Sequence, residues 1–176
     1  LKTVFVLLVC SWMWAESPIK VAAEKYIISQ FDADASINMH SLKLDAELKV
    51  LVQNKVKQRF YRDELYYWTI SDDDTNIAYA LMDNVIGKSM PITFLVILNN
   101  EGTILASKVI KYREAYGGEV GNKNWLAQFT NFTDTSQITV GKNIDGISGA
   151  TISVNSLSKG IKKIAVLFPL IKDKLN

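Results

Sequence analysis

Apolar residues recur along this chain at two different spacings, and the change from one to the other separates helices from strands. Between Ser41 and Val56 they recur every three to five residues among Lys, Asp, Glu and Gln, which predicts an amphipathic helix with Ser41 as its N-cap. Beyond this helix the spacing falls to two, so we expect three short strands at residues 57–61, 65–71 and 77–82. Residues 24–40 fit a short helix and a strand equally well.

The strongest strand signal lies in the middle of the chain. Residues 91–98 are almost continuously apolar, residues 99–102 contain turn-forming Asn and Gly, and residues 103–112 alternate again. This order predicts a β-hairpin.

Glycine-rich segments and helical spacing dominate the remainder. A loop at residues 117–121 leads into a short helix that ends near Phe129, and a second loop covers residues 141–149. Apolar residues at helical spacing then predict a last helix that starts at Thr151 and is broken by Pro169.

Together these elements predict an α+β fold, in which a meander and hairpins form one antiparallel sheet with flanking helices. We expect a single domain at residues 41–176, preceded by an N-terminal segment at residues 16–40. Length and composition agree, since 176 residues with 48% hydrophobic and 22% charged residues are typical of one globular domain.

Charge and reactive side chains narrow the possible functions. The net charge of +2 comes from 20 basic and 18 acidic residues that are interleaved, so we do not expect a nucleic-acid partner. Cys10 is the single cysteine and His40 the single histidine, which argues against a disulfide, a thiol nucleophile or a metal centre. The acidic residues 72–74 lack the spaced ligands of a calcium loop and are expected to form a solvated turn.

The first fifteen residues predict a signal peptide. Lys2 precedes an apolar run of about a dozen residues, fewer than the roughly 20 that a membrane-spanning helix needs. We therefore expect export, to the periplasm or the outer face of the cytoplasmic membrane. Retention by a membrane anchor or by a lipid on Cys10 stays open, although Val9 is an unusual residue before a lipidated cysteine.

Small residues are densest at 145–153, where the second glycine-rich loop meets the last helix. The ordinary interpretation is that Thr151 or Ser153 caps this helix and the glycines form the turn. A second interpretation starts from the free N–H groups and positive dipole end of a helix N-terminus, which suit a phosphate. Gly149 and Ala150 would leave the Thr151 hydroxyl accessible. Asp145 would position the loop, or a metal ion during transfer.

This segment resembles the flavinylation signature of the FMN-binding domain family, whose members include flavin-carrying components of the sodium-pumping NADH:quinone oxidoreductase and of the Rnf complex, and small stand-alone exported proteins. The matching residues are Asp145-Gly146-Ile147-Ser148-Gly149-Ala150-Thr151. Further matching segments precede it in the family's order: residues 87–88, 91–96, 101–102, 112–114, 116–117 and 125–129. In all, the resemblance covers roughly residues 75–168.

The resemblance implies a covalently bound cofactor. FMN would be esterified through its phosphate to Thr151, after transfer from FAD by a magnesium-dependent FAD:protein FMN transferase. Other expected cofactor-binding residues are Ser148, Gly149, Ala150, Asp145, Ser153, Glu114, Tyr116 and Gly117. Tyr112, Tyr116 and Trp125 are candidates to stack on the flavin ring, and Glu119 is a further candidate contact.

The role that this implies is electron transfer between a membrane donor and an extracytoplasmic acceptor. Residues 113–121 differ from the Glu-Thr-Pro-Gly-Leu-Gly loop of the respiratory members, so the stand-alone exported type fits better. Two alternatives stay open: a reductase that binds FMN reversibly, and a flavin-free binding or sensory module. We favour a carrier over an enzyme and assign no catalytic residue.

Overall fold

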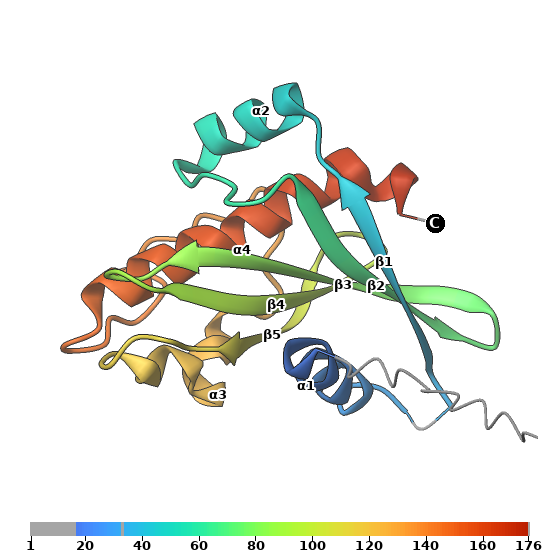
Figure 1. The fold of residues 1–176 in the computed structure, drawn as a ribbon, viewed down its shortest axis with the longest axis horizontal. Helices are drawn as coiled ribbons and strands as arrows, with labels where there is room; N and C mark the ends of the chain where they lie inside the picture. Colours follow the sequence, from blue (N-terminus) through green and yellow to red (C-terminus); the bar gives the residue numbers. More distant parts are fainter. Residues whose placement is uncertain (1–16, 33, 176) are drawn as a thin grey trace, which may run out of the picture.

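The computed structural model describes residues 17–32 and 34–175, and its centre is a five-stranded antiparallel sheet. Each strand pairs with the next along the chain, which makes the sheet a simple meander (Figure 1). The strands are β1 (Ser36–Lys43), β2 (Glu64–Asp72), β3 (Thr75–Ile86), β4 (Pro91–Asn99) and β5 (Ile104–Lys111). Together with the helices described next, this sheet confirms the predicted α+β fold. The predicted signal peptide, residues 1–15 with Cys10, lies outside the described residues.

Helices cover both faces of the sheet (Figure 1). The helix α1 (Pro18–Ile28) packs on one face, where Ala23 and Ile27 join apolar side chains of β2, β3 and β4. The other face packs against α4 (Thr151–Ile171), and α2 (Ala46–Val56) packs chiefly against α4. Because both faces are covered, nearly every residue of β4 is buried, which explains its continuous apolar run.

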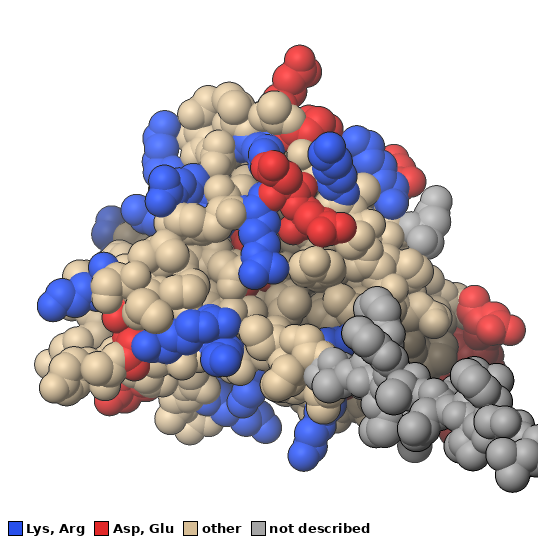
Figure 2. All heavy atoms as spheres, in the orientation of Figure 1, with Lys and Arg blue, Asp and Glu red and all other residues tan. Residues whose placement is uncertain are grey.

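The short helices lie between β5 and the loop that leads to α4. They are η1 (Gly118–Gly121), α3 (Lys123–Leu126) and η2 (Ala127–Phe129), and η3 (Lys172–Lys174) follows α4. No helix within the described residues is long and apolar enough to cross a membrane. On the face seen in Figure 2, basic and acidic side chains are interspersed rather than gathered by sign.

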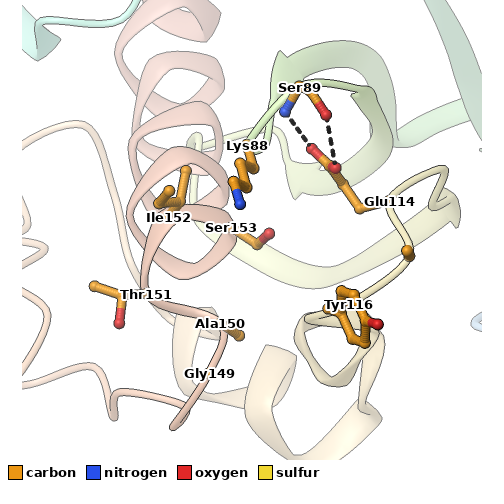
Figure 3. A pocket seen from close by; sticks show the side chains of 10 residues that line it. Lys88, Ser89, Glu114, Tyr116, Gly149, Ala150, Thr151, Ile152 and Ser153 are labelled. Atoms are coloured by element: carbon orange, nitrogen blue, oxygen red, sulfur yellow. Dashed lines mark hydrogen bonds between the residues drawn. The ribbon is translucent and has the colours of Figure 1, made fainter.

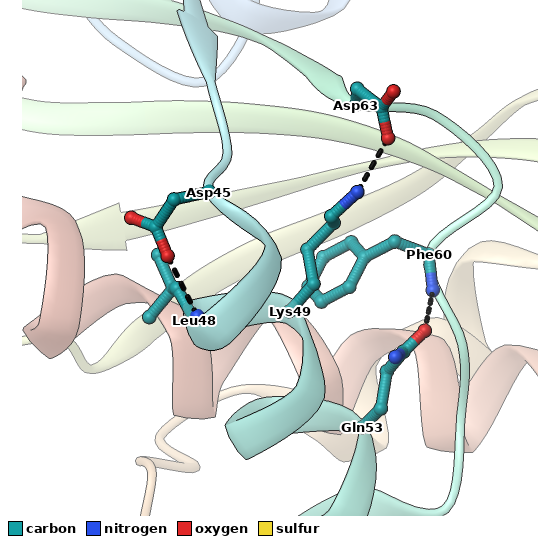
Figure 4. A network of polar contacts seen from close by, with 6 residues as sticks. All are labelled: Asp45, Leu48, Lys49, Gln53, Phe60 and Asp63. Carbon is teal, nitrogen blue, oxygen red and sulfur yellow. Dashed lines mark hydrogen bonds and ion pairs between the residues drawn. The ribbon is translucent and has the colours of Figure 1, made fainter.

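The helix predicted to begin at Ser41 begins instead at Ala46. Asp45 is its N-cap, and the Asp45 carboxylate accepts a hydrogen bond from the Leu48 N–H at 2.7 Å (Figure 4). Ser41 lies in β1 opposite Tyr66, so long-range strand pairing overrides the local helical pattern. The ambiguous stretch 24–40 contains both the end of a helix and the start of β1, and the expected boundary at 40/41 falls inside that strand.

The predicted strand at 57–61 is wrong, because these residues form a loop that α2 holds in place. Lys57 ends α2 in the left-handed conformation, with φ of 54°. The Phe60 N–H donates to Gln53 Oε1 at 2.8 Å, and Lys49 pairs with Asp63 (Figure 4). The predicted break at Pro169 is also wrong. Pro169 lies in the last turn, where a missing N–H costs one hydrogen bond, and α4 continues to Ile171.

A buried ion pair joins α4 to the sheet. The Lys163 ammonium lies 2.8 Å from the Asp83 carboxylate on β3, and the Lys163 side chain is fully buried. The ammonium also donates to the Arg59 carbonyl at 2.8 Å and lies 4.3 Å from the centroid of the Phe60 ring. Three parts of the chain therefore meet at one desolvated cation.

Gly160 allows α4 to approach the sheet closely. A Cβ at this position would lie 2.6 Å from Val85 Cγ1 and 2.9 Å from Phe94 Cζ, both within the core. Because these distances are shorter than real Cβ contacts, any larger residue would push α4 away from β3 and β4.

We expect Lys163→Met to lower the free energy of unfolding by about 3–5 kcal/mol, since it leaves the Asp83 carboxylate buried without a counter-charge. Adding Asp83→Asn should recover part of the loss because it removes the second charge. Urea unfolding measures both, with exposed Lys159→Met as the control on the same helix, expected within about 0.5 kcal/mol of the wild type. If Lys163→Met were as stable as the wild type, the ion pair would not have this role.

We expect Gly160→Ala to destabilise the protein by about 1–3 kcal/mol through overpacking, although Gly to Ala inside a helix normally stabilises. Gly146→Ala is the matched control, because a Cβ there meets no atom within 4 Å. Thermal unfolding of the two variants checks the sign. A rise in the melting temperature of Gly160→Ala would show that α4 can shift at little cost.

Candidate functional site

The N-terminus of α4 lacks a side-chain cap. Ala150 occupies the N-cap position and α4 begins at Thr151, so the ordinary interpretation, in which Thr151 or Ser153 caps the helix, is wrong. Thr151 is exposed, whereas Ser153 is buried and turned toward Tyr112. The first N–H groups of a helix have no partner within it, so this end of α4 presents donors and a positive dipole.

Two side chains of the preceding helical segment, Trp125 and Gln128, hold the loop before α4 in place. The Trp125 indole N–H donates to the Asp145 carbonyl at 2.8 Å, and the Asp145 N–H donates to Gln128 Oε1, also at 2.8 Å. Trp125 is itself buried and makes an edge contact with Phe129 at 5.3 Å between ring centroids. Trp125 therefore positions the loop, and its ring is not open for stacking.

Gly149 supplies the turn into α4. Its φ of 78° lies in the left-handed region, which favours glycine. The Ala150 N–H donates to the Ile147 carbonyl at 3.0 Å, and the Val154 N–H then donates to the Ala150 carbonyl at 2.9 Å. The chain thus passes directly from a tight turn into the helix, with Thr151 at its first position.

Tyr112 connects this helix start to the loop after β5. Its hydroxyl donates to the Tyr116 carbonyl at 2.5 Å and lies 2.9 Å from Ser153 Oγ. Because a phenol has one proton to donate, Ser153 must be the donor in the second bond. Gly117, with φ of 83°, lets the loop pass, since a Cβ there would lie 2.8 Å from the Tyr112 hydroxyl oxygen.

These contacts leave a pocket of about 600 Å³ between the helix start, the β3–β4 turn and the loop after β5 (Figure 3). Its lining residues are Lys88, Ser89, Glu114, Ala115, Tyr116, Gly149, Ala150, Thr151, Ile152 and Ser153. A neighbouring pocket of about 350 Å³ is lined by residues 115–119, Ser148 and Gly149. The volume of the first pocket is within the usual range for small-molecule and cofactor sites.

Most of the residues predicted from the sequence meet here. Six of them line the first pocket, namely Thr151, Gly149, Ala150, Ser153, Glu114 and Tyr116, and Ser148, Gly117 and Glu119 line the second. Asp145 lines neither, and its side chain is exposed on the loop. Tyr116 is 86% exposed, so its ring is open to a ligand, in contrast to that of Trp125.

Glu114 binds the protein itself rather than projecting freely into the pocket. Its carboxylate accepts a hydrogen bond from the Met90 N–H at 2.8 Å. It accepts two more from Ser89, one from the N–H at 2.7 Å and one from the hydroxyl (Figure 3). These bonds, the one from Met90 first, lower the pKa of Glu114 below its usual value. Glu114 therefore fixes the β3–β4 turn, which forms one wall of the pocket.

Sequence reasoning missed four lining residues of this pocket, namely Lys88, Ser89, Ala115 and Ile152, and two of them change its chemistry. Lys88 extends from the β3–β4 turn toward the first turn of α4 and brings a positive charge to the pocket (Figure 3). Ile152 adds an exposed apolar surface beside Thr151. The sequence signal for Lys88 was that the Gly87-Lys88 segment matches the family, but this match did not indicate what Lys88 does.

His40 lies away from this site. Its ring stacks on Tyr67 at 5.0 Å and Nε2 lies 3.2 Å from the Thr69 hydroxyl. Among residues 17–32 and 34–175, no group of three or more His, Cys, Asp and Glu side chains could hold a metal ion.

Comparison with protein families identifies the region that builds the site. Residues 87–166 match the family model described as the FMN-binding domain, which confirms the resemblance. The matched region runs from the β3–β4 turn into α4 and contains every residue that lines the first pocket. No match to the chain was found among curated proteins.

We expect Glu114→Gln to lower the melting temperature at neutral pH, since the carboxylate of Glu114 is stabilised as an anion by the turn. The pKa of Glu114 is lowered by folding, so its contribution is present above the pKa of the unfolded state and fades as the pH falls through the lower, folded value. The gap between variant and wild type should therefore shrink below about pH 4.

Glu119→Gln is the matched control. Glu119 is exposed in the neighbouring loop, and its side chain makes no hydrogen bond or ion pair that the structure records among the described residues. Melting curves from neutral to acidic pH check the prediction. A Glu114→Gln gap that stays constant with pH would contradict it.

Proposed function

Residues 87–166 belong to the FMN-binding domain family, and on this premise we propose that the chain is an electron-transfer protein that carries FMN covalently on Thr151. The observation that carries the proposal is the position of Thr151. Its side chain is exposed at the uncapped N-terminus of α4, beside the pocket of about 600 Å³.

The residues around Thr151 fit a phosphate ester. The first turn of α4 contains no acidic residue, and its free N–H groups and dipole favour an anion. Lys88 adds a cation from the facing turn. A phosphate on the Thr151 oxygen would lie at this helix end, where these three contributions act together.

The pocket also offers surfaces for a flat aromatic ring system. Tyr116 presents an exposed aromatic ring, and Ile152 presents an exposed apolar side chain. Of the three stacking candidates, Tyr116 fits best, because hydrogen bonds hold Tyr112 and Trp125 in the walls of the site. When bound, FMN supplies the redox chemistry, while these residues bind and orient it.

Attachment requires access for a second enzyme. In the proposed transfer from FAD, a bond forms between the Thr151 oxygen and the FMN phosphorus, the pyrophosphate bond breaks, and AMP leaves. The hydroxyl proton passes to a base of the FAD:protein FMN transferase. Exposure of Thr151 and the open space around Gly149 support this access, because a Cβ at Gly149 would meet no atom within 4 Å.

The proposed setting follows from the predicted export of the chain. We place the protein in the periplasm or at the outer face of the cytoplasmic membrane, between a membrane donor and an extracytoplasmic acceptor. Covalent attachment suits that setting, because a released flavin would be lost by diffusion.

Thr151→Val tests the proposal, since it removes the hydroxyl and keeps the shape of the side chain. In cells that contain an active transferase, the wild-type chain should retain flavin fluorescence on a denaturing gel and Thr151→Val should lose it. Thr151→Ser keeps a hydroxyl and should retain some flavin. Ser156→Ala, one turn further along α4, is the control and should be labelled like the wild type.

The same gel separates the alternatives. Flavin that binds the native protein and leaves on denaturation would support a reductase with reversibly bound FMN. No flavin in either state, beside a labelled control substrate of the transferase, would support a flavin-free module. Undiminished labelling of Thr151→Val would place the ester on another residue.

A further inference from the structure

Another polar pocket, separate from both pockets of the site described above, lies between α2, the loop before α4 and the exposed side of α4. Its volume is about 370 Å³. We call it the lysine pocket, and its lining residues are Lys55, Val56, Ser136, Gln137, Ile138, Thr139, Val140, Asn155, Ser158, Lys159 and Lys162.

The lysine pocket is lined by positive charge, and the Asp134 carboxylate near Lys162 lies outside its lining. Three lysines line it and no Asp or Glu does. Among the salt bridges that the structure records within its described residues, none includes Lys55, Lys159 or Lys162. An anion that enters would therefore not have to displace a carboxylate from a salt bridge with any of these three lysines.

Lys162, which lines this pocket, is held by two backbone carbonyls. Its ammonium donates to the Asp134 carbonyl at 2.6 Å and to the Ser136 carbonyl at 2.5 Å. Burial and then the nearby Lys55 lower the pKa of Lys162, against a smaller opposite effect of Asp134. The lysine pocket thus concentrates like charges at a partly desolvated position, and a bound anion would relieve that repulsion.

Ser158 provides an independent sign of a missing ligand. This residue is 2% exposed, and its hydroxyl oxygen is buried with no hydrogen-bond partner. Buried hydroxyls are normally paired, and a helical serine commonly bonds to the carbonyl one turn earlier. Ser158 does neither, and it lines the pocket. Because its hydroxyl oxygen is buried, a rotation of the side chain would present the O–H to an acceptor in the pocket.

The walls define the rest of the ligand. Val56, Ile138 and Val140 give an apolar side, and Thr139 and Asn155 add polar groups. We propose that the lysine pocket binds a small organic oxyanion, with its phosphate or carboxylate group on the lysines and Ser158 and its apolar body against the valines and isoleucine.

The lysine pocket is distinct from the proposed flavin ester but shares a helix with it. Thr151, Asn155, Ser158 and Lys162 recur at helical spacing and so lie along one side of α4. With a rise of about 1.5 Å per residue, Ser158 lies roughly 10 Å along the helix from Thr151. The pocket would therefore hold its ligand on the same side of the helix as the flavin anchor and about two turns beyond it.

The test uses phenyl phosphate, benzoate and inorganic phosphate as probes, titrated into the full chain and into Thr151→Val. We expect saturable chemical-shift changes at the amides of residues 136–140 and of Ser158, with phenyl phosphate or benzoate binding more tightly than inorganic phosphate. The response should be the same in Thr151→Val. Because Thr151→Val cannot carry flavin on residue 151, probe binding by this variant tests the lysine pocket independently of the flavin proposal.

Two variants locate the binding. Lys55→Gln combined with Lys159→Gln should weaken the tighter probe about tenfold or more, whereas exposed Lys123→Gln should not. Ser158→Ala should also weaken it while leaving the melting temperature unchanged or higher, because it removes an unpaired buried hydroxyl. Ser156→Ala is its control. A structural role for Ser158 would instead lower stability.

The inference is overturned if none of the three probes produces saturable shifts at these amides, or if the shifts cluster around Lys88 and Thr151 instead. It is equally overturned if the double lysine variant binds as tightly as the wild type. Binding of inorganic phosphate alone, with no gain from the phenyl group, would refute the organic ligand.

Discussion

The close seating of α4 against β3 and β4 is the constraint on which the rest of the structure depends. Gly160 permits the contact, and the ion pair between Lys163 and Asp83 fixes it within the core. Because the middle of α4 is held by this ion pair and by close packing at Gly160, the helix has little freedom to slide or rotate. The direction of its first turn is therefore set by packing roughly 13 Å away from it, at a rise of about 1.5 Å per residue.

The loops around the start of α4 are fixed to this rigid helix and to the segments beside it. Trp125 and Gln128 hold the chain before it, Tyr112 ties the loop after β5 to Ser153, and Glu114 closes the facing turn. Each of these contacts ends on backbone or on a buried hydroxyl, so the pocket walls are fixed while Thr151, Ile152 and Tyr116 stay exposed. The site therefore combines fixed pocket walls with the exposed side chain of Thr151.

The sequence was a good guide wherever the pattern was local. The hairpin of β4 and β5 and the start of α4 at Thr151 follow from apolar runs, turn residues and helical spacing. Prediction failed where partners distant in the chain decide the outcome. Ser41 joins a strand because β2 pairs with it, and residues 57–61 form a loop because Gln53 and the buried Lys163 hold Phe60 and Arg59. The role of Glu114 in the β3–β4 turn and the reach of Lys88 into the pocket likewise depend on tertiary contacts.

The two glycines of the segment before Thr151 have different reasons to be glycine. Gly149 has a left-handed backbone, so the fold itself requires glycine there. Gly146 has neither a positive φ nor a neighbour within 4 Å of a Cβ, so nothing inside the described part of the molecule demands its small size. The bare backbone at Gly146 leaves space beside the loop that would be open to the transferase of the proposed flavinylation. The segment thus combines one glycine that the fold requires with one that it does not require.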